Sequence, residues 1–179
     1  FEDVNGDGNL SAPEDKQTVL DMNPKYFGGL QNQISYKGVQ LDFLFQFVKQ
    51  VNYNATYLAG MPGRMTNQPT AVVNHWQQVG DTAGYQQYST GVNSAVVDAF
   101  SRYTESDAAI SDASFIRLKN VSLSYTLPAK WLSGMKCRLF VEGQNLLTIT
   151  KYKGADPEFK APGYLPPLRV FTAGLQFTL

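Results

Sequence analysis

The amino-acid sequence predicts an all-β fold, and more narrowly a segment of an antiparallel transmembrane β-barrel. Apolar and polar residues alternate with period 2 in several separate stretches. Long and short links between these stretches also alternate, and the polar positions hold mostly Gln, Asn, Ser and Thr. Because successive side chains of a strand point to opposite faces, each stretch predicts a strand with one apolar and one polar face. A sheet of such strands suits a wall between lipid and a wet interior.

The two clearest strands are neighbours in the chain. In 39–48 every second residue is apolar, namely Val39, Leu41, Phe43, Phe45 and Phe47. The stretch 30–36 also alternates, and only Lys37-Gly38 separates it from the next strand. A two-residue link of this kind between alternating runs predicts a tight β-hairpin. We expect the Phe-rich face of 39–48 to contact lipid.

Three further strands are predicted at about 115–127, 136–147 and 168–179. The first of these alternates regularly from Asn120 onward, whereas Phe115 to Lys119 mixes the two faces. The lone cysteine, Cys137, lies in the second and is interpreted as a small apolar residue of the strand.

The links between the predicted strands differ greatly in length. Residues 51–113 separate the second strand from the third, whereas Lys37-Gly38 and Pro128 to Gly134 are short, and Lys151 to Pro167 is of medium length. Outer-membrane barrels have short periplasmic turns and long extracellular loops. The pattern therefore predicts that 51–113 is extracellular and that the chain ends in the periplasm. A soluble antiparallel sandwich explains the period equally well but not the alternation of link lengths.

Composition and motifs exclude several classes of function. Lys+Arg and Asp+Glu are both 15, so no basic field exists to attract nucleic acid. No apolar run approaches the ~20 residues of a membrane helix. His75 has no partner in the sequence for metal or triad chemistry and is interpreted as local packing. Asp156 and Glu158 lie two apart on a Pro-containing loop without an evident oriented partner, so general acid–base catalysis cannot be argued. We do not expect an enzyme.

The last strand carries a more specific signal. Residues 172–179, TAGLQFTL, resemble the C-terminal β-signal by which outer-membrane proteins are recognised for assembly, so the barrel assembly machinery is an expected partner. An unpaired strand with apolar side chains on one face can add to an exposed sheet edge. Leu179 stands where an aromatic residue is usual. An ordinary amphipathic terminal strand is the alternative.

Four longer runs extend this likeness to one family. They are YFGGLQNQISYKGVQLDFLFQF (26–47), FIRLKNVSLSYTLPAKWL (115–132), QNLLTITKYKGADPE (144–158) and RVFTAGLQFTL (169–179). In sequence and order they resemble the C-terminal end of SusC/RagA-type TonB-linked outer-membrane transporters. The resemblance implies a large plugged barrel, of which this chain supplies the last five or so strands. It also implies import of oligosaccharides or peptides, a SusD-like surface lipoprotein as partner, and energy from the TonB complex through an N-terminal part that these residues do not contain.

The N-terminal residues contain a calcium-like loop. Residues 3–14, DVNGDGNLSAPE, match D-x-[DN]-x-[DN]-G-x5-E at every required position. Since Ca²⁺ prefers six to eight oxygen ligands, we expect a structural Ca²⁺ site. Its predicted ligands are Asp3, Asn5, Asp7, the carbonyl of Asn9, Ser11 through a water, and Glu14. Asp15 could replace Glu14. The alternative is a solvated acidic turn, because Asn-Gly and Asp-Gly form turns without metal.

These observations predict a division of the chain into four parts. Residues 1–25 are an extracellular loop with the calcium-like motif, 26–50 a barrel hairpin, 51–113 a long extracellular loop, and 114–179 the last three barrel strands. Outer-membrane lipid is then a partner of the strands. Two other functions remain open from the sequence: a soluble calcium-binding β module that recognises carbohydrate, and an outer-membrane adhesin.

Overall fold

The computed structural model describes residues 1–131, 135–159 and 164–178. Within these ranges the chain divides into two compact units. We call 24–50, 112–159 and 164–178 the sheet unit, and 1–23 with 51–111 the loop unit. Leu179, the last residue of the predicted β-signal, lies outside the described residues, as do 132–134 in the short link and 160–163 in the medium one.

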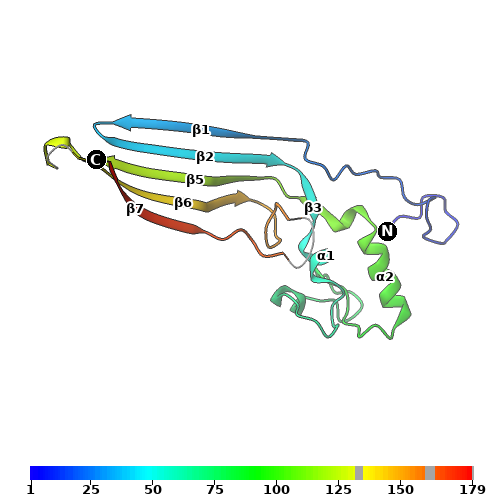
Figure 1. Ribbon diagram of the computed structural model, residues 1–179. Helices are drawn as coiled ribbons and strands as arrows, with labels where there is room; N and C mark the ends of the chain where they lie inside the picture. The colour runs from blue at the N-terminus through cyan, green and yellow to red at the C-terminus, as the bar shows by residue number, and fades with distance from the viewer. Residues whose placement is uncertain (132–134, 160–163, 179) are drawn as a thin grey trace. The chain divides into compact units, whose positions relative to one another are not determined.

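The sheet unit is built around one antiparallel sheet (Figure 1). In the described residues its strands are β1 (Tyr26–Tyr36), β2 (Val39–Lys49), β5 (Phe115–Thr126), β6 (Lys136–Thr150) and β7 (Val170–Thr178), in the order β1-β2-β5-β6-β7. We call this the main sheet. Each predicted strand is confirmed, with β1 beginning earlier and β6 ending later than its alternation predicts. Among the described residues β1 and β7 are the edges, each paired on one side.

The hairpin between β1 and β2 has the turn that its sequence predicts. Lys37 and Gly38 both have positive φ, 47° and 85°, as a two-residue type I′ hairpin turn requires. A Cβ at Gly38 would also lie 3.0 Å from the carbonyl oxygen of Thr126. The turn therefore fixes the register of β1 against β2. It leaves little room for a side chain at position 38.

Strand register gathers the apolar side chains on one face of the main sheet. One row across it contains Ile34, Leu41, Leu123 and Val141, each paired with the next. Leu123 and Val141 are 51% and 54% exposed although both lie on interior strands. An exposed apolar surface of this kind marks contact with a membrane or a partner.

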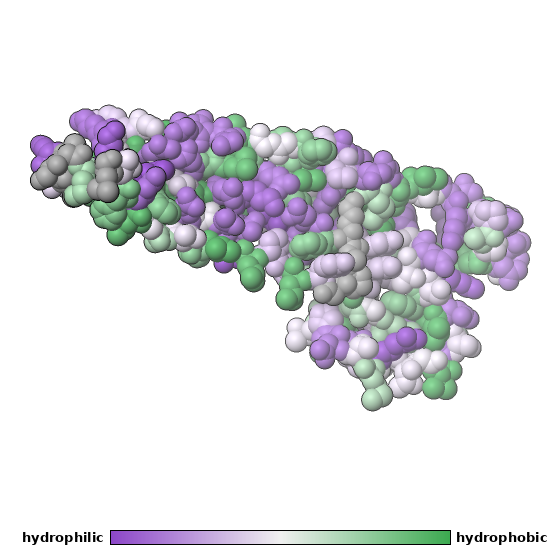
Figure 2. Space-filling model, viewed as in Figure 1, coloured by the Kyte–Doolittle hydropathy of each residue, from purple (hydrophilic) through white to green (hydrophobic). Residues whose placement is uncertain are grey.

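The opposite face of the main sheet is polar. Its corresponding row contains Gln33, Asp42, Ser122, Glu142 and Thr172. Figure 2 shows hydrophilic residues gathered over the middle of the sheet and hydrophobic residues along its lower margin. The sheet thus separates an apolar from an amide- and hydroxyl-rich surface, as the alternation predicts.

A β-bulge explains why the first part of β5 mixes its faces in the sequence. Leu44 pairs with Asn120 but the next residue, Phe45, pairs with Leu118, so Lys119 is an extra residue in β5. The pairing of β5 with β6 is irregular at the same place, where Asn145 has φ 53°. An extra residue reverses the alternation. Even-numbered residues before the bulge therefore share the apolar face with odd-numbered residues after it.

The loop unit contains more regular structure than the sequence predicts. Besides the small sheet of β3 (Val51–Tyr53) and β4 (Ile110–Asp112), the elements of 51–113 are α1 (Ala55–Ala59), η1 (Thr70–Val73), α2 (Ser94–Thr104) and η2 (Asp107–Ala109). A further 3-10 turn, η3 (Ala129–Trp131), follows β5. Across all the described residues, in both units, no helix is long and apolar enough to cross a membrane.

Asparagine side chains organise this unit. The Asn54 side chain accepts from the Tyr57 amide at the start of α1 and from the Tyr103 hydroxyl at 2.7 Å. It also donates to the Ala108 carbonyl at 2.7 Å. Asn93 caps α2 by accepting from the Ala95 amide. Such caps satisfy amides that a helix leaves unpaired at its beginning.

His75 packs locally, as expected from the sequence. Its ring stacks on that of Tyr88 with centroids 3.6 Å apart, and its backbone forms a bridge with Tyr85. The 3-10 turn η1 (Thr70–Val73) ends two residues before it.

The two faces of the main sheet lead to opposite expectations for the same substitution. In the complete protein folded in lipid vesicles, Leu123→Arg should lower the free energy of unfolding by about 2–4 kcal/mol, because the cation would lie on the face that the sequence predicts to contact acyl chains. Ser122→Arg is the matched control, since its side chain lies on the polar face between Asp42 and Glu142. Urea titration of both variants measures the difference; equal losses would contradict the assignment of faces.

Candidate functional site

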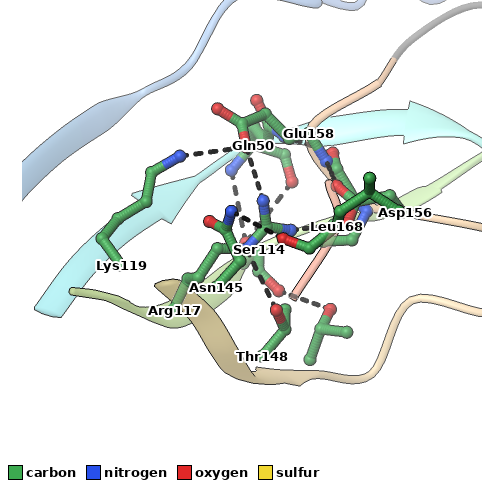
Figure 3. A network of polar contacts seen from close by, with 11 residues as sticks. Gln50, Ser114, Arg117, Lys119, Asn145, Thr148, Asp156, Glu158 and Leu168 are labelled. Carbon is green, nitrogen blue, oxygen red and sulfur yellow. Dashed lines mark hydrogen bonds and ion pairs between the residues drawn. The ribbon is translucent and has the colours of Figure 1, made fainter. Parts of the chain in front are cut away.

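A buried arginine on the polar face of the main sheet is the centre of a network of polar contacts in the sheet unit (Figure 3). Arg117 is 1% exposed. Its Nη2 donates to Asp156 Oδ2 at 2.6 Å, its Nη1 to Glu158 Oε2 at 2.7 Å, and its Nε to Thr148 Oγ1 at 3.0 Å. One guanidinium therefore binds two carboxylates that both come from the segment after β6.

The bulge in β5 sets the direction of this arginine. Because Lys119 is the extra residue, Arg117 and Phe115 lie on the polar face although they are odd-numbered. The guanidinium carbon lies 5.1 Å from the centre of the buried Phe115 ring, within cation–π range. Lys119 reaches the same group, with Nζ 3.7 Å from Glu158 Oε2.

The segment that carries the two acids is held in a defined shape. Asp156 Oδ1 accepts from the Glu158 amide at 2.9 Å, and the Gln50 side chain donates to the Pro157 carbonyl at 2.6 Å. A Cβ at Gly154 would lie 2.1 Å from the Tyr152 ring, so glycine is needed for this ring to pack there. Burial, and secondly the charge of Asp156, raises the pKa of the Tyr152 phenol.

The arrangement does not suit general acid–base catalysis. Both carboxylates are engaged by Arg117, and Asp156 is only 8% exposed. The adjoining hollow of about 210 Å³ is lined by Thr148, Tyr152, Asp156 and Arg169, among others. A paired, desolvated arginine is a structural anchor, because removing one partner of a buried ion pair costs about 3–5 kcal/mol.

The sequence shows no partner for Asp156 and Glu158, and the structure supplies one. Arg117 lies 39 and 41 positions away in the chain. The sequence feature that could have pointed to this ion pair is an arginine within Phe115 to Lys119. The irregular alternation there does not assign its side chain to either face of the sheet. Only the pairing of β5 with β6 brings it to this segment.

A second ion pair lies at the end of β2. Lys49 Nζ is 2.7 Å from Asp112 Oδ2, and Asp112 also accepts from the Ser114 amide and hydroxyl. Bonding to Lys49 first, and then to Ser114, lowers the pKa of Asp112 to about 2. The Asp112 side chain is 56% exposed, so solvent screens most of this interaction.

The calcium-like loop is folded by hydrogen bonds from its side chains to its own amides. Asp3 accepts from the Gly6 and Gly8 amides at 2.7 and 2.8 Å, and Asp7 accepts from the Asn9 amide. Ser11 Oγ donates to Glu14 Oε2 at 3.3 Å. Asn5 Oδ1 accepts from the Asp7 amide.

Asp15 closes this loop. It accepts from the Ser11 and Val4 amides at 2.7 and 2.8 Å, and these bonds lower the pKa of its carboxyl. Across the described part of the chain, no three His, Cys, Asp or Glu side chains are grouped as they would be around a metal ion. The predicted ligands thus lie in one loop, and their binding of calcium stays a prediction.

Comparison with known proteins gives close likeness over almost the whole chain. No family model matches the sequence. The chain is 30% identical to TonB-dependent receptor P3 of Formosa agariphila over 98% of its length, and 28% identical to TonB-dependent receptor SusC of Bacteroides thetaiotaomicron over 90%. Its structure resembles the RagAB peptide importer in the open-open state with a TM-score of 0.70, at 28% identity over 96% of the chain.

The chain belongs to the SusC/RagA type of TonB-dependent transporters. It spans 18% of the Formosa agariphila receptor, 15% of SusC and 19% of the RagAB chain that it matches. The main sheet of this SusC/RagA-type chain is accordingly a part of a barrel wall, without closing a barrel itself.

Membership of the SusC/RagA type also settles two coarser expectations. TonB-dependent receptors are outer-membrane proteins, so this chain is assigned to the outer membrane. These relatives are TonB-dependent receptors, a class of transporter and not of enzyme.

Loss of the Asp112 charge should destabilise the complete SusC/RagA-type protein slightly. Because folding lowers the pKa of this carboxyl, its stabilisation is complete above the ordinary value of 3.8 and is lost as the pH falls through about 2. Asp112→Asn should therefore lower the free energy of unfolding by about 0–1 kcal/mol at pH 7 and by less at pH 2, where about half of the native carboxyls are protonated in the folded protein. Melting curves at both pH values test this; Asp21→Asn, an exposed acid outside the pair, is the control. A loss as large at pH 2 as at pH 7 would contradict it.

Proposed function

We propose that the chain forms part of the wall and outer loops of a TonB-dependent transporter that imports oligosaccharides, or peptides, across the outer membrane. The observation that carries the proposal is the two-faced main sheet, in a chain whose relatives are TonB-dependent receptors and a peptide importer. An apolar face toward lipid and an amide-rich face toward the interior suit a polar cargo in a wet lumen.

The link lengths support one orientation of the strands. Lys37-Gly38 is a tight turn and β5 is followed closely by β6, whereas 51–113 separates β2 from β5. In this proposal the short links are periplasmic and the loop unit is extracellular. The C-terminal strand then ends in the periplasm, where the barrel assembly machinery would meet its β-signal.

Two partners follow from the same family. One of the solved structures resembling this chain is the RagAB importer, and another relative is SusC. We infer that the complete transporter pairs with a SusD-like surface lipoprotein and draws energy from the TonB complex. Because the family and fold are those of a membrane transporter, the soluble calcium-binding module is not retained as an alternative.

Uptake in living cells tests the transport function. Deleting the complete gene from its host should abolish growth on at least one oligosaccharide or peptide mixture as sole carbon source. Growth should return with the intact gene and should again be lost when TonB is depleted. Normal growth of the deletion strain on every such mixture, or growth that needs no TonB, would overturn the proposal.

Calcium is proposed as a structural ion of the loop 3–14. The proposal is supported by the match at every required position and by the oxygen chemistry of the side chains. The carboxylate of Asp3 already lies over the amides of Gly6 and Gly8. Carboxylates that accept from their own backbone amides keep lone pairs with which a cation could bind.

Calcium should stabilise the complete transporter, and Asp3→Ala should abolish the effect. Calcium at 100 times its dissociation constant adds about 2.7 kcal/mol to the free energy of unfolding when the metal binds only the folded state. Calorimetry with and without calcium measures the change in melting temperature. Asp21→Ala removes a carboxylate outside the motif and should leave the response intact. No response to calcium in the native protein would reject the site.

A further inference from the structure

Residues 151–159 return from the end of β6 to the polar face of the main sheet, and we call this segment the strap. We propose that the strap is a separately releasable element that Arg117 holds in a docked position, with Asp156 as its main anchor. Arg117 is then a positioning residue for a segment that covers part of the polar face. This inference does not depend on which substrate is transported.

Burial ranks the ion pairs of the strap. The pair of Arg117 with Asp156 joins side chains that are 1% and 8% exposed, whereas Glu158 is 36% exposed. Lys119 is a weaker partner, 3.7 Å from Glu158 and 32% exposed. Because solvent screens exposed pairs and desolvation penalises an unpaired buried charge, Asp156 holds the strap more strongly than Glu158 does.

Release of the strap should be all-or-none. If Asp156 leaves, the guanidinium of Arg117 remains inside the protein with only Glu158 and Thr148 as partners. Asp156 and Glu158 lie two residues apart in the strap and bind the same guanidinium, so a strap that leaves the polar face removes both carboxylates together. The Gln50 bond to the Pro157 carbonyl is neutral and does not replace the lost charge pairing.

The strap is distinct from the strands that carry it. Arg117 and Thr148 belong to β5 and β6, whose pairing runs from Phe115 with Thr150 to Thr126 with Arg138 through backbone hydrogen bonds. Those ladder bonds do not require Asp156 or Glu158. The strap can therefore leave while β5 and β6 stay paired, and this separates a positioning role of Arg117 from a general role in barrel stability.

Hydrogen exchange of the complete transporter in detergent, followed by mass spectrometry, tests the proposal. Amides of 151–159 should exchange about tenfold faster, or more, in Arg117→Gln and in Asp156→Asn. Glu158→Gln should have a smaller effect, and Lys119→Gln less still. The double variant Arg117→Gln/Asp156→Asn should be no faster than Arg117→Gln alone, because Asp156 acts on the strap through Arg117. In all these variants the amides of β5 and β6 should keep their native rates.

Two further variants serve as matched controls. Arg117→Lys keeps the charge but cannot bind both carboxylates as a planar guanidinium does, so it should rescue only part of the protection. Arg138→Gln removes an arginine from the polar face of β6 that forms no ion pair in the described part of the chain, and should leave the strap unchanged.

Two results would overturn the proposal. Native exchange of 151–159 in Arg117→Gln would mean that other contacts hold the strap. Equal acceleration of the strap and of β5 and β6 would mean that Arg117 stabilises the wall as a whole and that the strap is not a separate element. If Arg117→Gln fails to fold, Asp156→Asn decides the matter alone, since it keeps the arginine and changes only the anchor.

Discussion

Strand register is the constraint on which the rest of this structure depends. A slip of one residue reverses every side chain of a strand, so two opposite surfaces can exist only if all strands keep the same alternation. The bulge at Lys119 changes the alternation within β5 and returns the earlier residues to the correct faces. It also turns Arg117 toward the polar face, where an ionised side chain can find partners. The bulge is therefore a common cause of the two-faced sheet and of the polar network around Arg117.

Burial of Arg117 shows what the polar face must supply. Moving a guanidinium out of water is costly unless charge and hydrogen bonds replace the water. Asp156, Glu158 and Thr148 provide these bonds, and the ring of Phe115 lies against the guanidinium. The cluster carries one positive and two negative charges before Lys119 is counted. Lys119, placed on the same side by the bulge, brings the group close to neutrality.

The sequence predicts the strands well because their signal is local. Alternation gives the extent of β2 almost to the residue, and Lys37-Gly38 gives the turn. What escapes prediction is non-local or breaks the period. The bulge is visible only as a loss of alternation in Phe115 to Lys119, and the partner of Asp156 follows from the pairing of two strands. Helix α2 escapes because a short amphipathic helix inside a long loop has a weak pattern, although Asn93 is a recognisable cap. Calcium binding stays a prediction, since the same side chains can bind a metal or hold a turn.

The unpaired outer sides of β1 and β7 have a consequence for how these residues can exist in a membrane. Within the described residues each of these strands has a neighbour on one side only. The amide and carbonyl of every second residue therefore point to the unpaired side and need a hydrogen-bond partner. Hydrocarbon offers none, and each unsatisfied group costs several kcal/mol. These strands cannot rest in lipid by themselves. They are stable in a bilayer only when further strands pair with both edges and close the sheet. Their stability in the membrane therefore depends on those neighbouring strands as much as on their own side chains.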